Sequence, residues 1–344
     1  MTAAKPGGKP PASANPKSRT AFVTGGTGFL GVNLIDRLLD DGWTVTALHR
    51  TNSKLDELKS RKVTLAEGDI IDAASLTRAM PRDLDAVFHV AASISLWSRK
   101  NAEQEEINVG GTRNVIEAAL AAGAAKLVHT SSISVYGLQK GKIDESAEQL
   151  GRVSWLGYQR SKYLAEEEVR TGVGRGLPAT ILNPCNIIGA YDQSGWARLI
   201  RMIADGSLPG VPPGSNSFAQ VGEVAKAHIA AVDKGKVGEN YLLGGVDDSI
   251  LNMVQMIGRL LDREVPSKPI APWKLQAVSR LAAAVAAVTG KEPRVSPESA
   301  ALASRQLFGD SSKAERELGY RAVPLEEMLR ESIDWLRRRG LIAA

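Results

Sequence analysis

The sequence predicts an α/β protein built on a doubly wound parallel sheet, with a smaller and less regular C-terminal region. Three observations lead to this prediction. Short apolar runs alternate with helical patterns as far as about residue 188. A glycine-rich turn, TGGTGFLG at residues 24–31, joins the first apolar run to the first helical pattern. Beyond residue 188 the alternation loosens and prolines punctuate shorter elements.

Hydrophobic periodicity places the elements in order along the chain. Strands are expected where apolar and β-branched residues form short runs, at residues 21–24, 44–48, 63–67, 86–90, 126–130 and 179–182. Helices are expected where apolar residues recur on one face, at residues 32–41, 73–80, 111–122, 158–170, 194–204 and 222–232. Ligands of such sheets lie at the carboxyl ends of the strands. The residues that follow the strands are therefore the first candidates for function.

The glycine-rich turn predicts a cradle for the phosphates of a dinucleotide. Gly25 permits the tight turn, Gly28 lets a pyrophosphate approach the backbone, and Gly31 lets the helix pack closely on the strand. The helix that follows offers free N–H groups and the positive end of its dipole. The cofactor contacts expected in this Rossmann-type domain are Gly25, Thr27, Gly28, Phe29 and Leu30. A glycine-rich turn without a ligand is the alternative.

Composition narrows the class of protein. The chain has 344 residues, enough for one large domain or two, and a net charge of +5. Lys5, Lys9, Lys17 and Arg19 supply +4 of this charge. Because the remaining chain is nearly neutral, nucleic acid is not an expected partner. Residues 1–19 are rich in Pro, Gly, Ala and Ser and are expected to form a disordered tail.

Cysteine content and hydropathy bear on the location of the protein. The single cysteine, Cys185, excludes an internal disulfide framework and favours a reducing, cytoplasmic compartment. We expect no membrane span and no metal site. The most apolar stretch, residues 275–288, is 14 residues long and includes Arg280. We expect a buried or pocket-covering helix there, and a helix lying on a membrane surface is the alternative.

Tyr158 and Lys162 are candidates for acid–base chemistry. Their i, i+4 spacing puts them on one face of a helix, a turn apart. A nearby ammonium favours the phenolate, which lowers the pKa of a tyrosine from its ordinary value near 10. Tyr158 could then exchange a proton with a carbonyl or an alcohol near neutral pH. An ordinary tyrosine and lysine on a solvated helix face are the alternative.

Ser131 and Ser132 follow the strand expected at residues 126–130, so they stand where a ligand would lie. A serine hydroxyl at this place can donate a hydrogen bond to an oxygen that gains negative charge during hydride transfer. The alternative is that the two serines only begin a turn.

In combination these motifs resemble the extended short-chain dehydrogenase/reductase family, within the NAD-dependent epimerase/dehydratase superfamily. Three further stretches are similar to that family: Gly68-Asp69-Ile70, FHVAA at residues 88–92 and INVGGTRN at residues 107–114. The resemblance is close over residues 20 to about 235 and looser beyond. It implies an NAD(P)-binding domain at 20–189 and a mainly substrate-binding region at 190–344, of which 218–235 pack back on the first domain.

The resemblance implies a role for each motif residue. Tyr158 is the proton donor or acceptor, Lys162 holds the nicotinamide ribose and lowers the pKa of Tyr158, and Ser132 is the catalytic serine. Ser131 is a less favoured substitute, and Asn108 is a candidate relay residue. The other cofactor contacts that the resemblance implies are Asp69, Ile70, Ala91, Ala92, Thr130, Pro184 and Ile187.

Arg50 favours NADP over NAD. It follows the second strand, where NAD enzymes usually carry an acid for the ribose 2′-hydroxyl, and an arginine suits a 2′-phosphate instead. Lys54 is close in the sequence and could add a second cation. Binding of NAD beside a solvated Arg50 is the alternative.

The primary interpretation is an NADP-dependent oxidoreductase that passes a hydride between nicotinamide and a carbonyl or secondary alcohol of a small, apolar or aromatic molecule. The motifs are similar to those of dihydroflavonol reductases and the nearby 3β-hydroxysteroid dehydrogenases. The candidate substrate contacts are Ser93, Ser95, Trp97, Ser132 and Tyr158. Trp97 could equally be a core aromatic.

Two other functions stay open. The stretch Val135-Tyr136-Gly137 resembles sugar epimerases, so a nucleotide-sugar epimerase with retained NAD is the second interpretation. A non-catalytic protein that senses NAD(P) on the same fold is the third. A dehydratase is not expected, because Ile133 and Ser134 stand where such enzymes carry an Asp-Glu pair. The resemblance also implies a homodimer formed through the helices that follow Asn108 and begin at Tyr158.

Overall fold

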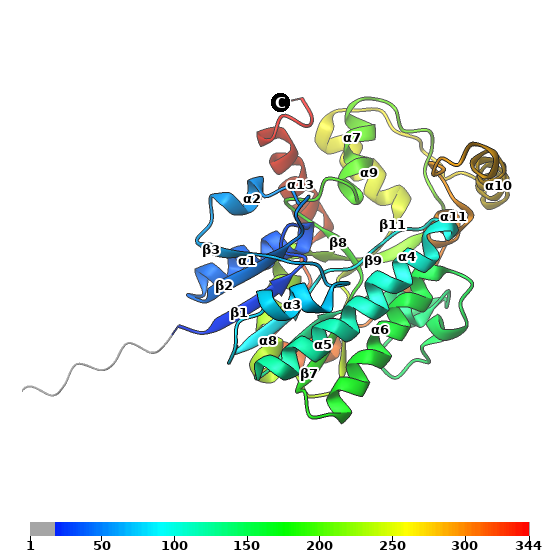
Figure 1. The fold of residues 1–344 in the computed structure, drawn as a ribbon. Helices are drawn as coiled ribbons and strands as arrows, with labels where there is room; N and C mark the ends of the chain where they lie inside the picture. The colour runs from blue at the N-terminus through cyan, green and yellow to red at the C-terminus, as the bar shows by residue number, and fades with distance from the viewer. Residues whose placement is uncertain (1–17, 344) are drawn as a thin grey trace, which may run out of the picture.

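The centre of the molecule is a seven-stranded sheet in which neighbouring strands run parallel (Figure 1). Its order is β3 (Val63–Glu67), β2 (Thr44–His49), β1 (Thr20–Thr24), β4 (Ala86–His89), β5 (Leu127–Thr130), β7 (Ala179–Pro184) and β10 (Asn240–Leu243). The strand order reverses between β1 and β4, as in a doubly wound Rossmann sheet. The predicted fold class is confirmed by this computed structural model, which describes residues 18–343.

Helices cover both faces of the central sheet. One face carries α1 (Phe29–Asp40), α8 (Val221–Lys234) and α12 (Ser312–Leu318). The other carries α3 (Ala73–Ala79), α5 (Gly111–Ala122) and α6 (Gly157–Gly174). The short connecting elements are α2 (Asp56–Lys59), α4 (Asn101–Glu105), a π-helical segment at Glu106–Gly110, and 3₁₀ turns at Ser98–Lys100, Ile133–Tyr136 and Leu150–Val153. Each face thus has its own apolar core, as the alternating pattern requires.

The C-terminal region has a second sheet and a third core. The sheet order is β11 (Val246–Ser249), β9 (Ser215–Gln220), β12 (Gln306–Gly309) and β6 (Gly141–Ile143), and β8 (Asn186–Ile188) also pairs with β9. The helices α7 (Trp196–Ala204), α9 (Ile250–Leu261) and α13 (Leu325–Arg338) bury their apolar faces together. Two further helices, α10 (Pro272–Thr289) and α11 (Pro297–Ala303), lie at the edge of the molecule (Figure 1).

The six strands and six helices expected from periodicity are all present, with ends that differ by up to four residues. The first helix starts three residues earlier than expected, because Gly28 is the N-cap of α1 and the glycine turn leads straight into it. Strand β10 and the second sheet were not expected. These strands are three to six residues long, and β9 reads SNSFAQ, so they carry little of the periodicity on which the prediction depended.

Residues 1–17 of the predicted tail lie outside the described residues. The predicted tail ends at residue 19, and its last two residues, Ser18 and Arg19, contact the body of the protein. The Ser18 hydroxyl donates to the carbonyl of Gly42 at 2.6 Å, and Arg19 forms an ion pair with Asp233 on α8 at 2.8 Å. Helix α8 itself packs against α1 in the core of the first sheet, although it follows the C-terminal strand β9 in the chain.

Helix α10 contains the apolar stretch at residues 275–288. The expectation of a buried or pocket-covering helix is wrong: α10 buries only Leu275, Ser279 and Ala286, and Leu281 and Val288 are 68% and 90% exposed. The reason is geometric, since a single narrow strip of α10 faces the body of the protein. Across residues 18–343, no helix combines the length and apolarity that crossing a bilayer would need.

Candidate active site

A cavity of about 750 Å³ runs along the carboxyl ends of the central strands. This volume is typical of small-molecule sites, which span roughly 300–1,000 Å³. The cavity starts at the glycine turn after β1 and reaches α6 and the end of β7. The predicted cofactor contacts that line it are Gly25, Thr27, Gly28, Phe29, Leu30, Arg50, Asp69, Ile70, Ala91, Ala92, Thr130, Tyr158, Lys162, Pro184 and Ile187. The structure does not bring Lys54 to the cavity wall.

The glycine turn is packed tightly against its neighbours, and the first turn of α1 beside it is open to the cavity. Gly25 has a φ of +71°, and a Cβ there would lie 2.6 Å from the backbone nitrogen of Ala91. A Cβ at Gly31 would collide with the carbonyl oxygen of Gly25. The N-cap Gly28 places no side chain over the first turn of α1, which lines the cavity. These residues fit the pyrophosphate of a dinucleotide, which binds to the N–H groups of a helix start.

The side chains of Ser132, Tyr158 and Lys162 come together at the other part of the cavity. Tyr158 and Lys162 project from successive turns of α6. Ser132 follows β5, and its hydroxyl accepts a hydrogen bond from the backbone nitrogen of Ser134 at 3.1 Å. The Nζ atom of Lys162 donates to the carbonyl of Thr130, the last residue of β5, at 2.7 Å. One helix and one strand end therefore supply a hydroxyl, a phenol and an ammonium to one wall.

The electrostatics of Tyr158 differ from the sequence-based expectation. Burial raises the pKa of Tyr158, while the hydroxyl of Ser132 and the guanidinium of Arg305 lower it. Lys162 was expected to be the cation that lowers the pKa of Tyr158, but in the structure Arg305 has this effect. Burial lowers the pKa of Lys162 to about 8, and the carboxylate of Glu166 opposes this shift. Arg305 is thus a candidate functional residue that the sequence analysis missed.

Arg305 belongs to the C-terminal region and acts on Tyr158 without itself lining the cavity. It immediately precedes β12, and its Nε atom donates to the side-chain oxygen of Asn216 at 3.2 Å. Its Nη1 atom is buried and makes no hydrogen bond within residues 18–343. A buried N–H group without a partner costs about 1–3 kcal/mol. No local motif marks this arginine, because β12 reaches the site only by pairing with β9 and β6 in the folded chain.

Asn108 holds the cavity wall against α6. It lies in the π-helical segment, a geometry that is frequent at functional sites. Its side-chain oxygen accepts from the backbone nitrogen of Ser93 at 2.7 Å, and its amide nitrogen donates to the Ser161 hydroxyl at 2.9 Å. Asn108 does not itself line the cavity. These contacts support a positioning role, and a relay role for Asn108 stays a prediction.

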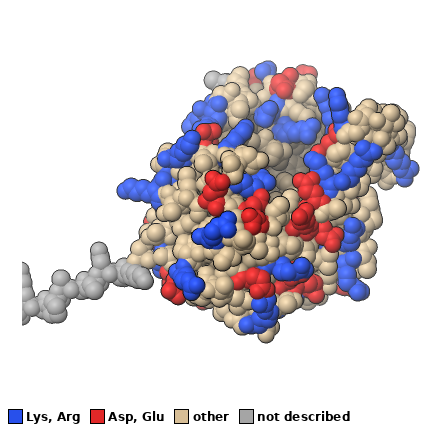
Figure 2. All heavy atoms as spheres, viewed as in Figure 1, with Lys and Arg blue, Asp and Glu red and all other residues tan. Residues whose placement is uncertain are grey.

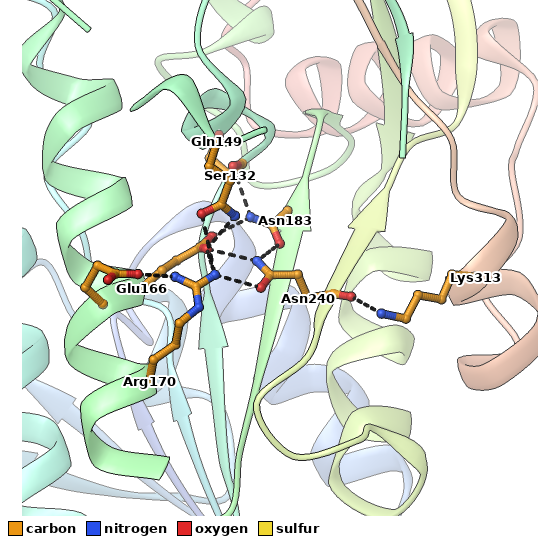
Figure 3. A network of polar contacts seen from close by, with 8 residues as sticks. Ser132, Gln149, Glu166, Arg170, Asn183, Asn240 and Lys313 are labelled. Atoms are coloured by element: carbon orange, nitrogen blue, oxygen red, sulfur yellow. Dashed lines mark hydrogen bonds and ion pairs between the residues drawn. The ribbon is translucent and has the colours of Figure 1, made fainter. Parts of the chain in front are cut away.

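A buried polar network fixes α6 to the central sheet (Figure 3). The carboxylate of Glu166 is fully buried and pairs with Arg170 at 2.9 Å. It also accepts hydrogen bonds, at 2.6–2.9 Å, from the amides of Gln149, Asn183 and Asn240. The amide of Asn183 donates in addition to the carbonyl of Ser132 at 3.2 Å. The network therefore ties the backbone of the candidate serine to the helix that carries Tyr158 and Lys162.

Burial disfavours the charged form of three histidines, on β4, β5 and α8. Burial lowers the pKa of His89 on β4 to about 3 and that of His228 on α8 to about 4, and it also lowers the pKa of His129 on β5. His89 and His228 each bond to a threonine hydroxyl at 2.8 Å. In the part of the chain that the structure describes, no three His, Cys, Asp or Glu side chains gather as metal ligands.

Arg50 lies beyond the end of β2 on the cavity wall. It is exposed, and among residues 18–343 it forms no ion pair. Its backbone nitrogen donates to the hydroxyl of Ser53 at 3.0 Å, and Ser53 also lines the cavity. Sequence analysis missed Ser53, although its place in the loop after the second strand was a usable signal. Lys54 is exposed and does not line the cavity.

The predicted substrate contacts divide into two groups. Ser93 lines the cavity together with Ser132 and Tyr158, whereas Ser95 and Trp97 do not. Trp97 is partly exposed and lies under the cations of Arg99 and Lys100, so it is not a core aromatic either. Further cavity residues that sequence analysis missed are Ile94, Glu103, Glu106, Cys185 and Ser194. Burial raises the pKa of Cys185 to about 12, which disfavours the thiolate that a nucleophile needs.

A doubly wound sheet with a dinucleotide cradle and a Ser-Tyr-Lys wall defines a class of nicotinamide-dependent enzymes, which contains both oxidoreductases and epimerases. Residues 21–244 match the model of the NAD dependent epimerase/dehydratase family. The chain therefore belongs to the epimerase/dehydratase family and is an NAD(P)-dependent enzyme of the extended short-chain type.

Relatives of similar length support this assignment. A putative dihydroflavonol 4-reductase from Synechocystis sp. is 30% identical over 93% of this chain and 95% of its own. Sterol demethylase protein B from Methylococcus capsulatus is 32% identical over 94% of this chain and 100% of its own. The crystal structure of gox2253 matches with a TM-score of 0.82 and 31% identity, over 94% of this chain and all of that one. The predicted family and its similarity to dihydroflavonol reductases are confirmed.

Proposed function

We propose that the protein is an NADP-dependent oxidoreductase that interconverts a carbonyl and a secondary alcohol on a small, apolar or aromatic molecule. One observation carries this proposal. A single cavity joins the glycine cradle and Arg50 to the wall formed by Ser132, Tyr158 and Lys162. A bound nicotinamide would supply or accept the hydride. The side chains of the protein would then handle the substrate oxygen and its proton.

Each group on this wall suits one part of that task. In the direction of reduction, the Tyr158 hydroxyl would give its proton to the carbonyl oxygen, and it would take the proton back in oxidation. The Ser132 hydroxyl would donate a hydrogen bond to the same oxygen as it gains negative charge. The guanidinium of Arg305 would favour the phenolate that Tyr158 leaves behind, and Lys162, whose Nζ atom donates to the carbonyl of Thr130, would hold the nicotinamide ribose.

The choice of NADP rests on the residues beyond β2. Arg50 offers a guanidinium that suits a phosphate in a bidentate way, and the neighbouring Ser53 offers a hydroxyl. The last residue of β2 is His49, so no carboxylate stands at this strand end to bind a ribose 2′-hydroxyl.

A cofactor-oxidation screen tests the reaction. The purified protein is offered NADPH with aromatic ketones, steroids, aldehydes and nucleotide sugars, and loss of reduced nicotinamide is followed. Tyr158→Phe is expected to lower kcat by about 10²–10⁴-fold while cofactor binding persists. The matched control is Tyr163→Phe, which removes a hydroxyl on the same helix away from the cavity. Unchanged turnover in Tyr158→Phe, or turnover of a nucleotide sugar by tightly bound NAD without net oxidation, would contradict the proposal.

Arg50→Ala tests the cofactor assignment. The wild type is expected to prefer NADPH over NADH in kcat/KM, and the variant should lose about 10–100-fold of that preference, as expected for the loss of a charged hydrogen bond. Lys54→Ala is the control, because it removes a nearby cation that does not line the cavity. If Arg50→Ala keeps the preference of the wild type, the 2′-phosphate is bound elsewhere or NAD is the cofactor.

We further propose a cytoplasmic homodimer formed through α5 and α6. The resemblance to the extended family supports the dimer, and the single cysteine supports the reducing compartment. Helices α5 and α6 are packed together and joined by the ion pairs Arg113–Glu168 and Arg175–Glu117, so they form one rigid surface. A molar mass in solution equal to that of one chain would contradict the dimer.

A further inference from the structure

The outer face of α10 is a continuous apolar surface. We define this face as Val278, Leu281, Val285 and Val288, which follow one another at helical spacing over about three turns. These side chains are 54–90% exposed. Scattered exposed hydrophobic residues are ordinary on a soluble protein, but a row of this length on one helix marks an interaction surface.

Positive charge borders this outer face. Lys274 and Arg280 lie on α10, Lys291 and Arg294 follow it, and α10 contains no Asp or Glu. Among residues 18–343, none of these four cations forms an ion pair, whereas Glu292 is paired with Lys100 at 2.9 Å. Figure 2 shows the same arrangement, with tan atoms where Figure 1 places α10 and blue atoms around them. The surface is therefore apolar in its middle and basic at its border.

We propose that α10 binds the surface of an anionic membrane. Its outer face would enter the boundary between headgroups and acyl chains, and its cations would lie at the lipid phosphates. A helix with one packed side and an apolar, basic-bordered opposite side is suited to lie in the plane of the interface. A second copy of this chain fits the same face less well, because a twofold contact would bring the unpaired cations of both copies together.

Helix α10 and the turn that follows it are hydrogen-bonded to residues 96–99, a segment that lies next to the cavity in the chain. The Arg99 guanidinium donates to the carbonyl of Ala287 at 2.9 Å, and the Ser296 hydroxyl donates to the carbonyl of Leu96 at 2.5 Å. This segment follows Ser93 and Ile94, which line the cavity, and Ile94 is 67% exposed. A membrane bound through α10 would thus lie beside one side of the cavity. None of the Ser-Tyr-Lys residues takes part in this contact, which is separate from the proposed reaction.

Sedimentation with vesicles tests the proposal. The full-length protein is mixed with vesicles of phosphatidylcholine alone or of phosphatidylcholine with phosphatidylglycerol, and the bound fraction is measured. Binding to the anionic vesicles is expected to be at least about tenfold stronger and to weaken as salt is added. The double variant Leu281→Glu/Val288→Glu is expected to fall to the level seen with neutral vesicles. The control Val153→Glu/Trp155→Glu alters two residues of comparable exposure that do not belong to α10 and should bind as the wild type does.

The possible results separate the proposal from its alternatives. No binding of the wild type to anionic vesicles, or equal binding by the α10 variant, overturns it. Loss of a dimer in the α10 variant, without vesicle binding by the wild type, shows instead that a second copy covers the face. Melting temperature and NADPH binding of the α10 variant verify its fold. Its turnover of a water-soluble substrate should be unchanged, so failure of the proposed reaction would leave the vesicle result standing.

Discussion

Helices α6 and α10 are both 18 residues long, yet their composition and their burial run in opposite directions. Helix α6 is rich in charged residues but buries eight of its positions, among them Lys162 and Glu166. Helix α10 is mostly apolar but buries three. Hydrophobicity alone would place α10 inside and α6 outside.

The difference shows that partners decide the place of each helix. The buried ammonium of Lys162 bonds to the Thr130 carbonyl, and the buried carboxylate of Glu166 has a guanidinium and three amides as partners. Buried charges are tolerated when they are paired and hydrogen-bonded in this way. In α10 only the strip formed by Leu275, Ser279 and Ala286 is buried, so the opposite side of the helix is exposed to solvent. The polar helix α6, which carries Tyr158 and Lys162, is therefore largely buried, and the apolar helix α10 is largely exposed.

Removal of the Glu166 carboxylate should have the largest effect on stability. Glu166→Ala leaves the amides of Gln149, Asn183 and Asn240 without this acceptor and removes the buried one of the two carboxylates that pair with Arg170. We therefore expect a loss of about 3 kcal/mol in the free energy of unfolding, measured by urea denaturation. Glu167→Ala is the matched control, because Glu167 pairs with the same Arg170 at 2.7 Å but is 48% exposed. The control should lose less than about 1 kcal/mol. Equal losses would mean that the network of Figure 3 does not hold α6 in place.

Replacement of Arg305 should change the pH dependence of the reaction more than the stability of the protein. The guanidinium favours the phenolate of Tyr158 and so lowers its pKa. In Arg305→Met that pKa should rise, and the limb of the kcat/KM profile that reports Tyr158 should move to higher pH. Lys291→Met, which removes an exposed cation of the same C-terminal region, should leave the profile unchanged. Superimposable profiles for Arg305→Met and the wild type would show that Arg305 does not act on Tyr158.

What the sequence could predict depended on how local each signal is. The glycine turn, Arg50, Ser132 and the Tyr158–Lys162 pair each lie at the end of one strand or on one helix, and the structure places all of them on one cavity. Arg305 could not be found in this way, because its position depends on the pairing of β12 with strands more than 80 residues away. The burial of α10 was wrongly expected because the hydropathy of a helix does not determine how much of its surface packs against the rest of the protein.

A matched pair on α10 gives the smallest expected effect and tests the other half of the comparison. Leu275 is 7% exposed and faces the body of the protein, whereas Leu281 is 68% exposed and belongs to the outer face. Leu275→Ala removes a packed side chain and should cost about 2 kcal/mol in urea denaturation. Leu281→Ala removes the same atoms from water and should change stability by less than about 0.5 kcal/mol. A comparable loss of stability in both variants would mean that the outer face of α10 is already covered in solution. In that case α10 would be buried like α6, and the contrast between the two helices would disappear.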